Sequence, residues 1–333
     1  MKHQAQRGAA LLTAMVIVTL IATLAGSMVW QQWRAVQVEA AERARVQSQW
    51  ILDGAVDWAR LILREDARTG GVDHLGEPWA LPLAEAKLST FLAADRDNTD
   101  DAPDAFLSGV ITDAQSRFNL RNLIQPGPNA AANVQALAEL FELAGADAAA
   151  ASRVVAALRD AAPASPPVQD PNAKAGMNPP TEPQATRSAD APLMPERIDQ
   201  LAWLGLDAQT LQRIAPYVAL LPVVTPINAN TASKEVLAAV IPGMDLASAE
   251  RLVQLRQRNP LRQLKEITDL LPDKYAKTLD QGTVDFKSRY FVVRGRLRLQ
   301  DRVVEERALV ERRQLEIVLL RRERVTALDS VTQ

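Results

Sequence analysis

The N-terminus carries the feature that most constrains this chain, an uninterrupted apolar run. No charged residue occurs from Gly8 to Trp33, and the apolar core of the run extends from Ala9 to Trp30. An α-helix of this length rises about 33 Å, enough to cross a bilayer core of about 30 Å. We therefore predict a transmembrane helix over residues 9–33.

The charges that flank this run predict its orientation. Lys2 and Arg7 precede it, whereas the residues that follow Arg34 carry charges of both signs. Positive residues are retained on the cytoplasmic side of a membrane. We expect a single-pass protein with a cytoplasmic N-terminus and most of the chain on the far side.

The apolar run has three interpretations: a secretory signal peptide, a plain anchor or a prepilin-type leader followed by its helix. The run is too long for a secretory signal peptide, and no A-x-A cleavage site ends it. Arg7-Gly8 directly before Ala-Ala-Leu-Leu is typical of a prepilin leader, which is cleaved on the cytoplasmic side. Gly8 has no side chain to obstruct a peptidase. This pattern predicts cleavage between Gly8 and Ala9.

Thr13 stands at the fifth position after that cleavage site, where ordinary prepilins carry Glu. In a fibre, a buried Glu can pair with the free amine of a neighbouring subunit, and an unpaired charge there would be costly. A subunit with no neighbour above it needs no such carboxylate. Thr13 therefore marks a tip position, unless it is simply a tolerated small residue in a membrane helix.

Local periodicity predicts an α+β fold in which a long helix packs on an antiparallel sheet. Apolar residues on one stripe extend the helix through 34–66, with Trp50 and Trp58 in the core. Alternation predicts a strand at 105–112 and three more between 284 and 325. Ala-rich helices at 129–160 and short helices at 197–280 form a large inserted all-α domain. Nine of the twenty prolines lie between Pro163 and Pro195, which predicts a loop.

Composition argues against an enzyme. The chain of 333 residues has no cysteine and two histidines, which excludes thiolate chemistry and nearly excludes a histidine-based triad. Asp73, His74 and Glu77 could serve a membrane-anchored hydrolase, but no nucleophile motif accompanies them. A structural loop explains them better, and a solvated loop explains the acidic residues 94–104. The formal charge of -2 disfavours a general polyanion binder.

Residues 225–270 resemble a helix-hairpin-helix module, which binds DNA phosphates through backbone amides. Arg251, Arg256, Arg258 and Arg262 could form its basic face. However, the turn Pro242–Asp245 lacks one hairpin glycine, and Asp245 stands where a phosphate would bind. A structural helical scaffold is favoured, and a membrane-anchored DNA-binding or DNA-uptake protein remains the alternative.

Five segments in order resemble the protein K family of minor pseudopilins of the type II, or general, secretion pathway. They are RGAALLTAM at 7–15, DHLGEPWA at 73–80, DAQSRFNLRNL at 113–123, TPINANTAS at 225–233 and SRYFVV at 288–293. The resemblance implies a leader peptide (1–8), a transmembrane helix (9–33), its amphipathic continuation (34–66), a first part of the pseudopilin core (67–125), an inserted helical domain (126–280, with Pro-rich loop 163–195) and C-terminal antiparallel strands (281–325).

The resemblance also implies a function without catalysis. Prepilin peptidase would remove residues 1–8, and Ala9 would be N-methylated. The subunit would stay in the inner membrane with its C-terminal domain in the periplasm, and would assemble with I-type and J-type minor pseudopilins. At the tip of a short pseudopilus it would help to initiate assembly for protein export, and the residue at Thr13 is itself a mark of such a subunit.

Calcium is associated with an acidic stretch in this family, and that stretch is largely missing here. The corresponding segment is LRDAAPASPPVQDPNAKAGM, in which only Asp160 matches. Calcium takes six or more oxygen ligands. We therefore expect neither a metal site nor a cofactor.

Overall fold

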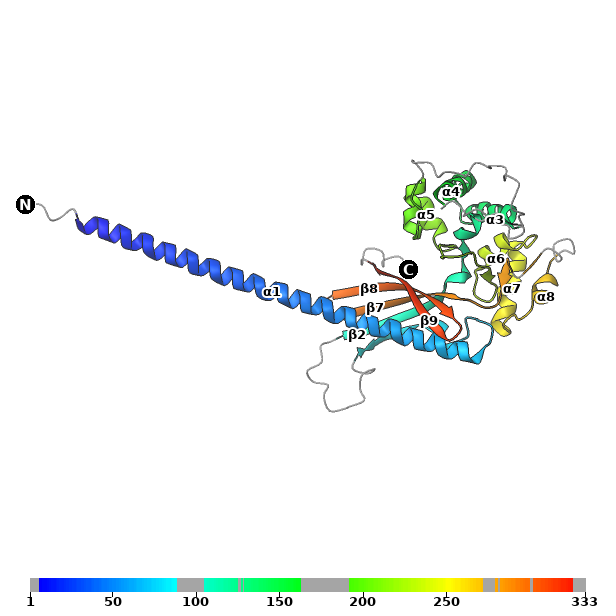
Figure 1. The fold of residues 1–333 in the computed structure, drawn as a ribbon, viewed down its shortest axis with the longest axis horizontal. Helices are drawn as coiled ribbons and strands as arrows, with labels where there is room; N and C mark the ends of the chain where they lie inside the picture. Colours follow the sequence, from blue (N-terminus) through cyan, green and yellow to red (C-terminus); the bar gives the residue numbers. More distant parts are fainter. Residues whose placement is uncertain are drawn as a thin grey trace, which may run out of the picture.

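The computed structural model describes residues 6–88, 105–124, 127, 129–162, 192–271, 279–280, 282–299 and 302–325, with side chains from Ala9 onward. Two predicted segments, the acidic loop at 94–104 and most of the Pro-rich stretch, therefore lie outside the described residues. The described residues form a long N-terminal helix, a sheet and a helical body at one end of the molecule (Figure 1).

Helix α1 (Gln6–Thr69) is a single element of 64 residues. Its N-terminal half extends far beyond the rest of the protein, and its C-terminal half lies along the sheet (Figure 1). Every residue from Ala9 to Ala40 is exposed. The predicted continuation of the apolar run into one amphipathic helix is confirmed. No Pro interrupts it, and backbone groups in the interior of a helix bond to one another.

The buried face of α1 differs from the predicted stripe. Leu52, Val56, Ala59 and Leu63 are the apolar α1 residues buried against the sheet. The prediction that Trp50 and Trp58 belong to the core is wrong, because their exposed fractions are 74% and 46%. The helix carries apolar residues on two faces, and periodicity alone does not show which face meets the sheet.

The sheet has five antiparallel strands in the order β1-β2-β7-β8-β9. One face packs on α1 through Phe291, Val293 and Val310, and the other carries mostly polar residues with an apolar patch near Tyr290 and Leu309. The strands are β1 (Leu83–Lys87), β2 (Ala105–Asp113), β7 (Tyr290–Leu299), β8 (Arg302–Arg313) and β9 (Glu316–Val325).

The predicted strand that begins at Val284 is divided in the structure. Val284–Asp285 (β6) pairs in parallel with Ile227–Asn228 (β5), and the sheet strand β7 begins only at Tyr290. Between them, the backbone N–H groups of Ser288 and Arg289 donate to side chains rather than to a neighbouring strand. Those bonds keep this segment out of the ladder, although its alternation is that of a strand.

The chain leaves the sheet after Asp113 and returns at Tyr290, and the helices between these points form the helical insertion, which has a core of its own. Its predicted boundaries at 126 and 280 stay a prediction. The elements are η2 (Ala114–Ser116), β3 (Phe118–Asn119), η3 (Leu120–Leu123), α3 (Ala130–Leu143), α4 (Ala148–Ala161), η4 (Ile198–Leu204), α5 (Ala208–Ile214), β4 (Val218–Ala219), β5, α6 (Lys234–Val240), α7 (Leu246–Arg258), α8 (Leu264–Thr268) and β6; η1 (Pro78–Ala80) follows α1.

Candidate functional site

The N-terminal part of α1 is the first functional element. It is the one helix in the described part of the chain that is long and apolar enough to cross a membrane. Gly8 and Ala9 lie within its first turns, and the Ala9 side chain is exposed. Thr13 Oγ1 donates to the Ala9 carbonyl over 2.8 Å, which satisfies the hydroxyl without any partner outside the helix. Cleavage at Gly8 and the role of Thr13 stay predictions.

A second apolar face continues along α1 beyond the membrane run. Trp33, Val36, Trp50 and Leu61 are each at least half exposed. The steps between them are three, fourteen and eleven residues, close to whole turns of an α-helix, so they share one side. We call these four residues the outer stripe. Large apolar side chains exposed on one side of a helix are candidates for contact with another protein.

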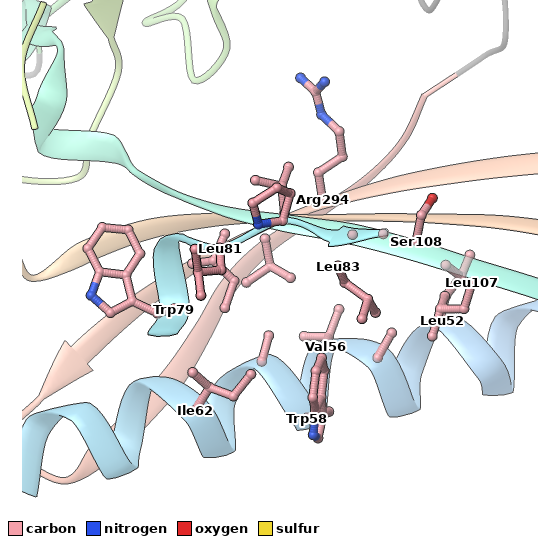
Figure 2. Close-up of a pocket in the computed structure, with 18 of the residues that line it drawn as sticks. Leu52, Val56, Trp58, Ile62, Trp79, Leu81, Leu83, Leu107, Ser108 and Arg294 are labelled. Carbon is pink, nitrogen blue, oxygen red and sulfur yellow. The ribbon is translucent and has the colours of Figure 1, made fainter. Parts of the chain in front are cut away.

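A hollow of about 250 Å³ lies between α1 and the β1–β2 side of the sheet (Figure 2). Gly109 on β2 and Gly295 on β7 are register partners, so neither strand places a side chain there. A Cβ atom on Gly295 would lie 3.3 Å from Leu52 Cδ2 of α1. Gly295 therefore permits the close approach of α1 to the sheet, whereas a Cβ atom on Gly109 would lie 3.1 Å from the Arg294 carbonyl oxygen of the neighbouring strand.

The helical insertion is joined to the sheet by a buried polar network, which we call the joint. Asp113, at the end of β2, accepts hydrogen bonds from Asn228 Nδ2 (3.0 Å), Thr231 Oγ1 (2.6 Å) and Ser288 Oγ (2.6 Å). Burial raises the pKa of Asp113 to about 6, although hydrogen bonds from Ser288, Thr231 and the Gln115 backbone lower it. Asn228 and Thr231 belong to the insertion and Ser288 to the segment before β7, so the network holds β2, the insertion and the start of β7 together.

Asp73 links the joint to the end of α1. Its carboxylate accepts from Ser288 N over 2.6 Å, and its carbonyl accepts from Asn228 Nδ2. Arg312 on β8 pairs with Asp73 and with Asp66 at the end of α1, the latter over 2.7 Å. Burial, together with the charges of Glu77 and Asp73, raises the pKa of Asp66 to about 7.

This arrangement gives a structural role to Asp73, His74 and Glu77, the three residues that the sequence offered for a hydrolase. Glu77 Oε2 accepts from His74 N and from Trp79 Nε1, and His74 Nδ1 accepts from Gly76 N. Carboxylate oxygens of Asp66, Asp73 and Glu77 lie within 4.8 Å of one another, but Arg312 already supplies a positive charge to two of them. The geometry is that of a loop fixed to a helix end. Of the calcium-associated stretch, Asp160 is described and is exposed, and 163–177 lie outside the described residues.

The hairpin between α6 and α7 does not offer a phosphate site. Asp245 Oδ1 accepts from Ser248 N over 2.7 Å, so a carboxylate occupies the N-terminus of α7. Arg256 is buried and donates to the Ala229 carbonyl, and Arg251 donates to Ser248 Oγ. Two of the four arginines of the predicted basic face therefore serve internal contacts, and the structure favours the scaffold over the DNA-binding alternative.

The sequence singled out the segments of the joint only as family motifs. Asp73, Asp113, Asn228 and Ser288 begin or lie within four of the five segments that carried the resemblance. No spacing along the chain predicts that they meet, because Asp113 and Asn228 are 115 residues apart. One feature of the sequence points to these four residues. They are polar, they lie next to apolar strands, and no catalytic motif accounts for them.

An apolar helix that extends from the molecule, packed at its far end on an antiparallel sheet, defines the class of pilin-like subunits. Two family models described as "Type II secretion system (T2SS), protein K" match residues 116–223 and 227–282. Type II secretion system protein K of Klebsiella pneumoniae is 30% identical over 272 residues, which cover 77% of this chain and 76% of that protein. The chain belongs to the protein K family of type II secretion systems, and is thus a minor pseudopilin.

Other comparisons agree over most of the chain. Protein K of Pseudomonas aeruginosa is 29% identical over 312 residues, 90% of this chain and 87% of that one. A solved structure of the GspK-GspI-GspJ complex from the enterotoxigenic Escherichia coli type 2 secretion system contains a chain with the same fold. The TM-score is 0.65 at 20% identity, and the match covers 86% of this chain and 99% of that chain. The predicted α+β, pilin-like fold is confirmed.

Proposed function

We propose that this minor pseudopilin stands at the tip of a periplasmic pseudopilus and helps to initiate its assembly, without catalysis. The observation that carries the proposal is α1, whose apolar surface is buried on one face by the sheet and left exposed along the outer stripe. An exposed apolar helix face is stabilised by a second helix packed against it. The sheet side of α1 is already covered by its own domain, so a neighbour meets the other side.

The partners we propose are I-type and J-type minor pseudopilins. The structural relative was solved in a complex named for GspK, GspI and GspJ, which supports this choice by analogy. The helical insertion lies at the end of the molecule opposite the membrane helix (Figure 1). In an assembled fibre the insertion would cover the space above this subunit, so no further subunit could pack its helix there.

Processing is the step that tests this proposal first. We propose that the N-terminus is cytoplasmic, that prepilin peptidase cleaves between Gly8 and Ala9 on that side of the inner membrane, and that Ala9 is then N-methylated. Mass spectrometry of the protein from membranes, with and without the peptidase, would show a methylated N-terminus at Ala9 only when the peptidase is present. Gly8→Trp would retain the leader, whereas Gln4→Ala, a matched change within the leader, would be processed normally.

Three other outcomes would contradict the proposal. A mature protein that begins near residue 26 would be a secreted product of ordinary signal peptidase. An intact N-terminus in both strains would be a plain membrane anchor, and normal processing of Gly8→Trp would place the cleavage elsewhere.

A further inference from the structure

The sheet face opposite α1 carries a group of arginines with no part in the leader, the outer stripe or the joint. Side chains alternate along β7, and Val293 faces α1, so Arg294 points to the other face. Arg307 on β8 is the register partner of Arg294. Cβ atoms of such partners lie about 5 Å apart. Burial, and then the charges of Arg294 and Arg307, lower the pKa of the Arg117 guanidinium, directly before β3.

These three residues, the arginine cluster, have little compensating charge among the described residues. Glu305 Oε1 lies 3.4 Å from Arg294 Nε, and no carboxylate in the described chain is within ion-pair distance of Arg117 or Arg307. Arg307 Nε is buried without a hydrogen-bond partner. Glu323, its register partner on β9, pairs instead with Arg321 over 2.7 Å.

Such an arrangement is costly without an additional anion. Like charges directly opposite each other on neighbouring strands repel, and a buried donor without a partner loses its hydration. A guanidinium presents paired N–H donors that match the oxygens of a carboxylate or a phosphate. Arg294 retains 40% of its side-chain exposure, so an anion can reach the cluster from solvent.

We propose that Arg117, Arg294 and Arg307 form a binding site for an oxyanion, which their guanidinium groups would hold between β7, β8 and the segment before β3. The chemistry is that of a carboxylate or phosphate group. Its source is either a free anion or an acidic side chain of another protein, and the two sources differ in the experiment below. The site is independent of the proposed role at the pseudopilus tip.

Isothermal titration of the full chain in detergent tests the site, with inorganic phosphate and a hexaglutamate peptide as probes at constant ionic strength. We expect saturable binding of at least one probe, weakened at least tenfold by Arg307→Gln. Arg302→Gln is the matched control, because Arg302 lies on the same strand as Arg307 but five residues away, and side chains an odd number of residues apart point to opposite faces of a sheet. Phosphate binding alone indicates a free anion, and peptide binding alone indicates a protein carboxylate. Failure of both probes to bind overturns the proposal.

Unfolding of the anion-free protein provides an independent readout. If the arginines repel one another, Arg307→Gln raises the thermal midpoint while it removes anion binding. If Arg307 instead stabilises the fold, Arg307→Gln lowers the thermal midpoint. A lower midpoint for Arg307→Gln than for Arg302→Gln would therefore contradict the repulsion on which the site rests.

Discussion

Asn228 Nδ2 lies 3.0 Å from the carboxylate of Asp113, and this contact joins the helical insertion to the end of β2. The same nitrogen also lies within hydrogen-bond distance of the Asp73 carbonyl oxygen and of Ser288 Oγ. The side-chain amide of Asn228 therefore connects the loop after α1, the sheet and the insertion. This joint fixes the insertion to the end of β2 and to the segment before β7.

Removal of the Asp113 carboxylate should destabilise the protein strongly. Asp113→Ala removes the buried carboxylate that accepts hydrogen bonds from the side chains of Asn228, Thr231 and Ser288. We expect a loss of about 3 kcal/mol in the free energy of unfolding, measured in urea by tryptophan fluorescence. Asp147→Ala, which removes an exposed helix cap, should cost much less. Equal losses in the two variants would show that the Asp113 carboxylate stabilises the protein no more than an exposed helix cap does.

The raised pKa of Asp66 predicts a pH dependence of stability. Its pKa is about 7 in the folded protein and near 3.8 when exposed, so the folded state binds a proton between these values that the unfolded state has released. The contribution of Asp66 to stability is therefore present below about pH 4 and is lost as the pH rises through 7. Asp66→Asn should gain stability relative to the wild type between pH 4 and pH 8. Urea midpoints across this range would show it, with exposed Asp57→Asn as the control.

The close approach of Gly295 to α1 predicts that substitutions at Gly295 and Leu52 affect the free energy of unfolding jointly. Gly295→Ala brings a Cβ atom to 3.3 Å from Leu52 Cδ2, so we expect a destabilisation of about 1–2 kcal/mol. Leu52→Ala creates a cavity and should cost more by itself. In the double variant the new methyl group occupies part of that cavity, so the combined loss should fall below the sum. Additive losses would mean that the two positions do not touch.

The outer stripe predicts which substitutions weaken assembly. Val36→Asp combined with Trp50→Asp should reduce copurification with I-type and J-type pseudopilins at least tenfold, because both residues face away from the sheet and are exposed. Val38→Asp is the matched control, since Val38 is equally exposed but lies on another side of α1. If Val38→Asp impairs assembly as much, the interface is not confined to the stripe.

Thr13 predicts a difference between two substitutions of similar size. Thr13→Gln keeps the position neutral, whereas Thr13→Glu adds a carboxylate that would find no amine above it at a tip. We expect both variants to be processed at Gly8, and only Thr13→Glu to be recovered less in the assembled complex. Improved assembly of Thr13→Glu would place the subunit within the fibre instead.

The periodicity of the sequence predicted those helices and strands whose formation depends on residues close together along the chain. The apolar run and the helix beyond it, the strand at 105–112 and the helices at 129–160 are all present. The assignment of Trp50 and Trp58 to the core failed, because α1 has two apolar faces and only the position of the sheet decides between them. The strand from Val284 was predicted too long, because side chains of Asp73 and Gln115, remote in sequence, bind the backbone of residues 288 and 289.

The sequence by itself determined that this protein has an apolar helix long enough for a membrane, a leader-like start and an α+β body, because these follow from local composition and period. Only the tertiary structure decided what Asp113, Asn228 and Arg312 do. Their hydrogen bonds and ion pairs join residues that are far apart along the chain, and no local pattern encodes such a meeting. The exposure of the outer stripe and the arginine cluster was decided in the same way, by which faces the sheet and the insertion cover.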